Sequence, residues 1–359
     1  MHMAFRAETV YITGHLVADQ AASPAIGDQF LDNLHALEPN QHGFIEVGRI
    51  AQLSTLPGLR QITTRCIDDL GDMSRNPLPQ EVKTIQPINL QPPIAAQFRF
   101  NILRGHAALL PKEIDTKLDA LSQGVSDYGA LHIRGFDIRG VGRATALALA
   151  KRIGEPYAEG NETDEIVQTI QPCDDEANLQ TSGSFDTDLD AHVENVGQEN
   201  VPDFLVLVCE DNIEQAETIV ISPLQALWSM RRRGLYKEES LLWRDRFWVR
   251  TPMSFAQQDR RDHHKVVEGY AELPIVHADF ADVGSEDGAT QKAYGLFQKA
   301  CLEEAQTIIL QSGDALLLRN TGPSLHAPTA LQVMHGRKPF TPNRITPRTL
   351  HRVYVHERR

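Results

Sequence analysis

The sequence predicts a mainly β protein with flanking helices, whose strands form a sandwich or jelly roll. From about residue 165 onward, short apolar segments recur at fairly regular spacing with turn residues between them. Before about residue 160 the predicted elements are mostly helices, so strands and helices do not alternate as they do in a parallel α/β fold. We therefore expect the early helices to pack on the outside of the sheets.

A chain of 359 residues allows two domains or one large β-rich domain. We expect residues 1–95 to form a helical extension packed on a single core that spans residues 96–359. Within the extension, residues 25–40 and 44–72 have the apolar spacing of helices. Residues 76–93 contain five prolines and few charges, which predicts an extended connector.

Within the core, the helix over 112–122 follows Pro111 and places Ile114, Leu118 and Leu121 on one face. The other predicted helices, by apolar periodicity, are 142–153, 223–233 and 290–305. Strands are predicted where short apolar or alternating runs are bounded by turn residues, at 129–136, 166–170, 204–209, 218–222, 247–251, 275–278, 315–319 and 350–356.

The charge balance argues against several classes of partner. Lys and Arg total 35 against 48 Asp and Glu, a formal net charge of −13, which repels nucleic acid and anionic membranes. The four cysteines form no C-x-x-C pair, so neither a zinc ribbon nor a redox pair is indicated. No apolar run reaches about 18 residues. We expect a soluble, cytoplasmic protein whose partner is a small molecule.

The clearest chemical signal is His192-Val-Glu194. In a strand, residues i and i+2 point to the same face, so an imidazole and a carboxylate would lie side by side. This is two-thirds of a 2-His-1-carboxylate site, the arrangement that leaves open positions on non-haem Fe(II). Alone the pair is a weak signal, because a polar strand edge has the same pattern.

Two later features strengthen it. His335 follows a late strand, about 140 residues after the pair, where a jelly roll could return a third ligand. His326 is nearly as good a candidate by spacing alone. Arg348 and Arg352 lie four residues apart near the end of the chain, and an arginine fork binds a carboxylate in a bidentate way.

Together these motifs resemble the clavaminate synthase-like branch of the Fe(II)/2-oxoglutarate-dependent oxygenases, which includes hydroxylases of free amino acids. The resemblance spans roughly residues 100–356 and rests on His192-x-Glu194, Gly313-Asp314, Asn320, His335-Gly-Arg-x-Pro-Phe-x-Pro342 and Leu350-His-Arg352-Val-Tyr354. It implies a double-stranded β-helix, or jelly-roll, oxygenase core. It also implies Fe(II), 2-oxoglutarate as co-substrate and O2.

The resemblance assigns a role to each candidate residue. His192, Glu194 and His335 would be the metal ligands and the catalytic centre, and Arg348 would bind the distal carboxylate of 2-oxoglutarate. Arg352 would meet the carboxylate of the substrate. Gln168 is a candidate for the substrate ammonium group.

The expected reaction is hydroxylation of an unactivated C–H bond in a free amino acid or amino-acid derivative, in specialised metabolism. A basic, arginine-like substrate would need acidic side chains in the pocket. Asp279 is the candidate for this role, with Asp282 after it and Asp186, Asp188 and Asp190 before the first ligand. Ordinary turn and surface positions are the alternative for these aspartates.

Several alternatives stay open at this point. The same centre could catalyse oxidative cyclisation or desaturation, because only the pose of the substrate separates these outcomes. A cupin-type metal-dependent isomerase or hydrolase could use the same three ligands with zinc or manganese, although it would not need the two arginines. A binding protein without metal, and a carrier-bound or peptidyl substrate, are the remaining alternatives.

Overall fold

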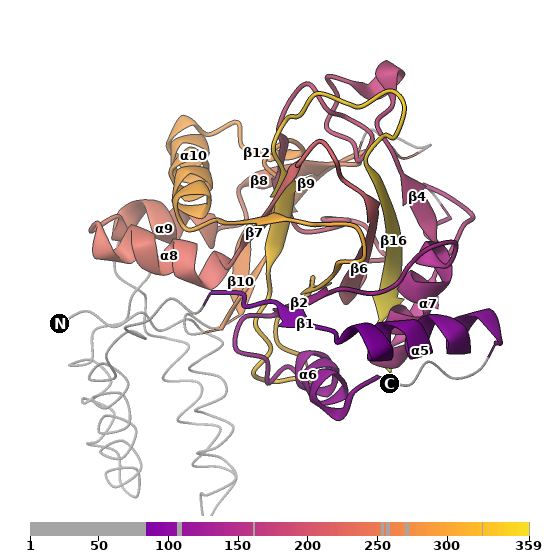
Figure 1. The fold of residues 1–359 in the computed structure, drawn as a ribbon. Coiled ribbons are helices and arrows are strands. Elements are labelled where there is room, and N and C mark those ends of the chain that lie inside the picture. Colours follow the sequence, from indigo (N-terminus) through magenta and orange to yellow (C-terminus); the bar gives the residue numbers. More distant parts are fainter. Residues whose placement is uncertain are drawn as a thin grey trace, which may run out of the picture. The chain divides into compact units, whose positions relative to one another are not determined.

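The computed structural model describes residues 84–105, 110–160, 162–252, 255, 259–269, 273–324 and 326–358. All of these except Gly269 belong to one compact unit (Figure 1). The second unit, Met1–Val82 with Gly269–Glu272, lies outside the described residues apart from Gly269. The helices predicted at 25–40 and 44–72 fall there, and the helical extension over 1–95 stays a prediction.

The larger sheet of this unit has seven strands in the described residues, in the order β1-β2-β14-β6-β16-β3, with β4 pairing β16. All neighbouring strands are antiparallel except β1 and β2. The bounds are β1 (Ile88–Asn89), β2 (Ala130–Arg134), β14 (Ala315–Arg319), β6 (Phe204–Asp211), β16 (Thr349–His356), β3 (Glu155–Tyr157) and β4 (Gln168–Ile170).

The second sheet is antiparallel and has the strand order β13-β7-β15-β5. Its bounds are β13 (Gln306–Ile309), β7 (Glu217–Ile221), β15 (Met334–Arg337) and β5 (Leu189–His192). Two small sheets complete the described strands: β12 (Val283–Gly284), β8 (Phe247–Arg250) and β9 (Arg260–His264) in one, and β10 (Val267–Gly269) and β11 (Pro274–Val276) in the other.

Successive side chains of a strand point to opposite faces of the sheet, so alternate residues of β6 belong to two different buried layers. On β6, Leu205 and Leu207 pack in one buried cluster with Val220 of β7 and Ile308 of β13, so this cluster lies between the two sheets. The alternate β6 residues, such as Val206, point the other way and pack against helices. These helices are α5 (Pro92–Leu103), α6 (Lys112–Ser122) and α7 (Gly142–Ile153), which lie near β2 and β16 in Figure 1.

The outer face of the second sheet is covered by a different set of helices. Ile219, Ile221 and Met334 pack in a buried cluster with α8 (Pro223–Arg232), α9 (Tyr236–Leu242) and α10 (Gly288–Glu303). Figure 1 shows these three helices on the opposite side of the unit from α5–α7. The predicted mainly β fold with flanking helices is confirmed.

Several predicted elements have the bounds that the sequence indicated, namely 112–122, 142–153 and 315–319. Helix α9 was not predicted, and α5 begins inside the proline-rich segment because Pro92 occupies the first helical turn, where its missing N–H costs nothing. Among the described helices, none is both long and apolar enough to cross a bilayer.

Candidate active site

Two histidines from neighbouring strands point into the space between the sheets. His335 on β15 pairs directly with His192 at the end of β5, and their ring centroids are 4.4 Å apart. Directly opposed residues of antiparallel strands share a face of the sheet. On its other side His335 pairs with Val220, whose side chain belongs to the cluster between the sheets. The register of three strands therefore places both imidazoles in the interior.

Glu194 joins the histidines although it lies beyond the strand. The sequence predicted that His192 and Glu194 share a strand, but β5 ends at His192. Instead, the Asn320 side chain holds the Glu194 backbone by accepting from its N–H at 2.7 Å and donating to its C=O at 3.1 Å. Asn195, directly after it, adopts φ 58°. The carboxylate still faces the imidazoles, as expected.

The three side chains fit a metal ion. Their nearest ligand atoms lie within 4.8 Å of one another. Glu194 Oε2 is 3.5 Å from His192 Nε2 and 3.2 Å from His335 Nε2, and it is buried without a hydrogen-bond partner among the described residues. His192 Nδ1 lies 2.7 Å from the Asp190 carbonyl oxygen, to which it donates, so Nε2 offers its lone pair to the centre.

The electrostatics of the three groups also favour a cation between them. Burial alone would lower the pKa of His192, but Glu194 raises it to about 9. Burial and the neighbouring His192 charge lower the pKa of His335. Burial opposes ionisation of Glu194, yet Arg352 and the two histidines hold its pKa well below the usual range. An ionised Glu194 carboxylate beside two imidazoles therefore favours a cation at this position.

His326, the alternative third ligand by spacing, lies elsewhere. It is exposed and does not line the cavity that contains the other three residues. The structure therefore brings His192, Glu194 and His335 together and leaves His326 apart.

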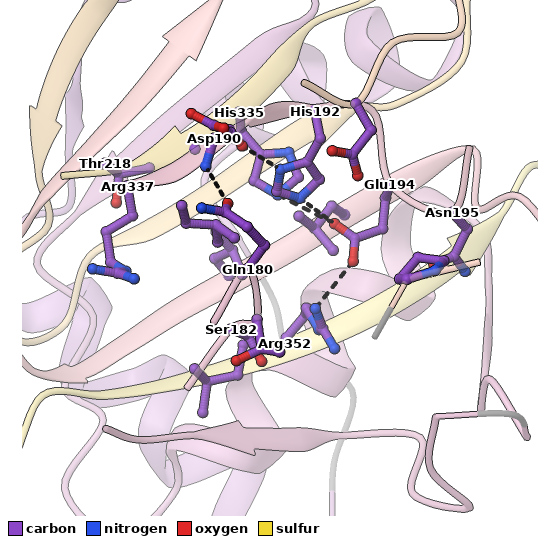
Figure 2. A pocket seen from close by; sticks show the side chains of 18 of the residues that line it. Gln180, Ser182, Asp190, His192, Glu194, Asn195, Thr218, His335, Arg337 and Arg352 are labelled. Atoms are coloured by element: carbon purple, nitrogen blue, oxygen red, sulfur yellow. Dashed lines mark hydrogen bonds and ion pairs between the residues drawn. The ribbon is translucent and has the colours of Figure 1, made fainter. Parts of the chain in front are cut away.

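Arg352 fixes the second oxygen of Glu194 (Figure 2). Its Nη1 donates to Glu194 Oε1 at 3.0 Å, its Nε to Gln168 Oε1 at 2.6 Å and its Nη2 to Glu162 Oε1 at 2.6 Å. Tyr354 Oη lies 2.5 Å from Glu194 Oε1 and 2.9 Å from Glu162 Oε2. Glu194 Oε1 is thus held by the protein, and Oε2 is the atom left for a metal.

The sequence pointed to Arg352 and Gln168 but not to Tyr354 or Glu162. A signal for Tyr354 was present, because it lies two residues after Arg352 in a strand and shares its face. Glu162 had no such signal, since it lies between β3 and β4 in a segment without regular periodicity.

Arginines gather at another part of the same cavity. Arg348, directly before β16, and Arg337, at the end of β15, both line the cavity and are both buried. Thr218 on β7 pairs directly with Arg337 and also lines the cavity. No sequence pattern predicted a role for Arg337, although it belongs to the His-Gly-Arg motif.

Acidic side chains form a third part of the cavity lining. Asp190, Asp279 and Asp282 line it, whereas Asp186 and Asp188 do not. Burial first, and then the charge of Asp279, raise the pKa of Asp282 to about 6. The pKa of Asp190 is raised by the same two causes. These carboxylates repel one another, so a cationic ligand would relieve their repulsion.

One open cavity connects these groups. Including the space at its mouth it has a volume of about 890 Å³, and its wall includes the two histidines and Glu194, the arginines and the aspartates. Figure 2 shows Asp190, His192, Glu194 and Arg352 around it.

Comparisons with known proteins agree with this geometry. The profile of the "Taurine catabolism dioxygenase TauD, TfdA family" matches residues 90–354, well over half of the chain. Comparison with curated protein sequences gives no significant match. Among solved structures, an asparagine oxygenase in complex with Fe(II), 2S,3S-3-hydroxyasparagine and succinate superposes with a TM-score of 0.65 at 21% identity, covering 76% of this chain and 94% of that one.

The non-haem iron oxygenase OrfP has the same fold. Its complex with Fe and alpha-ketoglutaric acid gives a TM-score of 0.62 at 19% identity, and its complex with Fe, succinate and (3S)-hydroxy-L-Arg gives 0.61 at 19%. Both cover 76% of this chain and 94% of OrfP. The jelly-roll core is thus shared with these structures, and the family match identifies the chain as a member of the TauD/TfdA family of Fe(II)- and 2-oxoglutarate-dependent dioxygenases.

Proposed function

We propose that the protein hydroxylates an unactivated C–H bond of a free amino acid or amino-acid derivative with a basic side chain, in specialised metabolism. The observation that carries this proposal is a single cavity lined by the two histidines and Glu194, by buried arginines and by repelling aspartates. Membership of a dioxygenase family decides against a cupin-type isomerase or hydrolase.

His192, Glu194 and His335 would hold Fe(II) on one face. The iron, when bound, supplies the activation of O2 that couples decarboxylation of 2-oxoglutarate to oxidation of the substrate. Two contacts hold these side chains in place. Asn320 forms hydrogen bonds with the Glu194 backbone, and His192 Nδ1 donates to the Asp190 carbonyl. This fixes which nitrogen and which carboxylate oxygen face the metal.

Arg348 would bind the distal carboxylate of 2-oxoglutarate. Its side chain is buried, and its Nε has no hydrogen-bond partner within the described part of the chain. Burial lowers the pKa of Arg348 to about 10, a measure of the cost of an unpaired buried cation. A carboxylate that reaches this guanidinium would offset that cost.

Arg352 would bind the carboxylate of the substrate. In this structure Glu162 Oε1 lies 2.6 Å from Arg352 Nη2, which marks a position that a carboxylate can take. A substrate carboxylate would replace Glu162 there. Gln168 Oε1 accepts from the same guanidinium, and its second lone pair is the acceptor that this residue would offer to the ammonium group. Gln168 is not among the residues that line the cavity, so this assignment stays a prediction.

Asp279, with Asp190 and Asp282 nearby, would receive the basic side chain. Asp279 Oδ1 accepts from the backbone N–H groups of Ala281 and Asp282, which fixes the carboxylate at the cavity wall. The similarity to OrfP, which was solved with a hydroxylated L-arginine, supports a cationic substrate. The three aspartates and Arg352 would hold the two ends of one amino acid with opposite charges.

The proposal is tested by incubating the metal-free protein with Fe(II), 2-oxoglutarate and a panel of free amino acids, and measuring succinate. We expect basic amino acids to stimulate succinate formation more than neutral ones, with a product that carries one additional oxygen atom. D279N should reduce the response to basic amino acids selectively. No stimulation by any free amino acid would overturn the proposal, and a product without added oxygen would indicate desaturation or cyclisation instead.

A further inference from the structure

We infer that Arg337 is a second binding residue for the distal carboxylate of 2-oxoglutarate, acting together with Arg348. The inference rests on the proposed function, because it assigns a further residue to the co-substrate site. It comes from the contacts of Arg337 itself, which place a second buried cation beside the first.

Arg337 and Arg348 lie against the same aromatic ring. The guanidinium carbon of Arg337 is 5.0 Å from the centroid of Phe340, and that of Arg348 is 5.7 Å from it. An aromatic ring attracts a cation through its face, but it does not neutralise the charge. Phe340 therefore contacts two buried cations, and both of them line the same cavity.

Neither guanidinium has an ion pair with a carboxylate in the described residues. Arg337 donates to Ser184 Oγ at 2.7 Å and to the Lys338 carbonyl at 2.9 Å, both uncharged acceptors. Buried charges in folded proteins are normally paired, so two unpaired cations at one end of a cavity call for an anion.

The position of Arg337 fits the length of the co-substrate. Arg337 lies two residues after His335 on β15, so its side chain leaves the same face of the sheet, about 7 Å further along the strand. Arg337 pairs directly with Thr218 on the neighbouring strand β7, and Thr218, which carries a hydroxyl group, also lines the cavity. Figure 2 shows Arg337 and Thr218 side by side, away from the histidines. A dicarboxylate that chelates the metal at one end would present its other end here.

The test compares two ligands that differ only in the distal carboxylate. Binding of 2-oxoglutarate and of 2-oxobutyrate to the Fe(II)-loaded protein is measured anaerobically by calorimetry, for wild type and for R337Q. We expect R337Q to raise the Kd of 2-oxoglutarate by about 10- to 100-fold, as for loss of a hydrogen bond to a charged group. The Kd of 2-oxobutyrate should change by less than about threefold, because this ligand lacks the carboxylate concerned.

Two further variants keep the comparison decisive. R337K retains the positive charge but not the bidentate geometry of the guanidinium, so it should bind 2-oxoglutarate more tightly than R337Q and less tightly than wild type. R344Q is the matched control, because Arg344 is exposed and pairs with Asp174 at 2.6 Å, so both Kd values should stay at the wild-type level.

An equal loss for both ligands in R337Q would overturn the inference, because Arg337 would then act only by holding the Ser184 segment. No loss for either ligand would overturn it as well. These results differ from failure of the proposed function, in which no free amino acid would stimulate succinate formation by wild type.

Discussion

Arg352 Nη1 lies 3.0 Å from Glu194 Oε1, the oxygen of this carboxylate that faces away from the two histidines. Tyr354 Oη lies 2.5 Å from the same oxygen. The two contacts leave only Oε2 for a metal and fix the rotation of the carboxylate. Groups that orient a metal ligand in this way commonly affect metal affinity nearly as strongly as the ligands themselves.

Removing the Tyr354 hydroxyl should therefore weaken metal binding. We expect Y354F to raise the Kd for Co(II), a coloured substitute for Fe(II), by about tenfold. The measurement is titration of the metal-free protein, followed by visible absorption. Y157F is the control, because Tyr157 packs near Tyr354 with ring centroids 6.0 Å apart but donates weakly to the Asn200 carbonyl at 3.5 Å. Wild-type affinity in Y354F would show that Arg352 alone orients Glu194.

Glu162 should compete with the substrate for Arg352. Because its carboxylate occupies the Nη2 side of the guanidinium, we expect E162Q to lower the KM for a free amino acid severalfold. The KM for the corresponding amino-acid amide should change little. E165Q is the matched control, since Glu165 is exposed and pairs with Arg143. A higher KM in E162Q would mean that Glu162 itself binds the substrate.

The pH dependence of substrate binding should report on Asp282. Burial and Asp279 raise the pKa of Asp282 to about 6, so this group loses its negative charge as the pH falls below 6. We expect the KM of a basic substrate to rise as the pH falls through 6, because one attractive charge is lost. D282N should flatten this part of the profile. A profile that is the same in D282N and wild type would assign the pH effect to another group.

Arg319 should stabilise the fold rather than the chemistry. Its side chain is fully buried, stacks 4.9 Å from the centroid of Phe204 and donates to the Leu121 and Ser122 carbonyls at the end of α6. We expect R319A to lower the free energy of unfolding by about 3 kcal/mol, because these carbonyls lose a charged donor. Urea denaturation measures the change. R358A, at an exposed ion pair, should have almost no effect, and a similar result for R319A would refute this role.

Local patterns predicted much of the fold. Helix α6 follows Pro111 with three apolar residues on one face, and β14 is a short apolar run after a Gly-Asp turn, so their bounds depend on nearby residues only. Helix α9 was missed because it is only seven residues long, too short for a clear period. The order of strands in the two sheets depends on contacts between distant residues, which periodicity does not contain.

In the site too, local spacing predicted some features, whereas contacts between distant residues could not be predicted. The spacing of His192 and Glu194 predicted that they face the same way, but the contact that holds Glu194 comes from Asn320, more than a hundred residues later. Glu162 and Arg337 were missed because their roles depend on partners in other strands. Glu162 accepts a hydrogen bond from Arg352 of β16, and Arg337 lies against the Phe340 ring, which also contacts Arg348.

The most direct test of the iron site is an anaerobic Fe(II) titration of the metal-free protein. Wild type and four variants are compared: H192A, E194A, H335A and H326A. We predict that the first three lose high-affinity binding, whereas H326A, altered at an exposed histidine outside the cavity, binds Fe(II) as wild type does. Loss of binding in H326A together with normal binding in H335A would contradict the proposed ligand set.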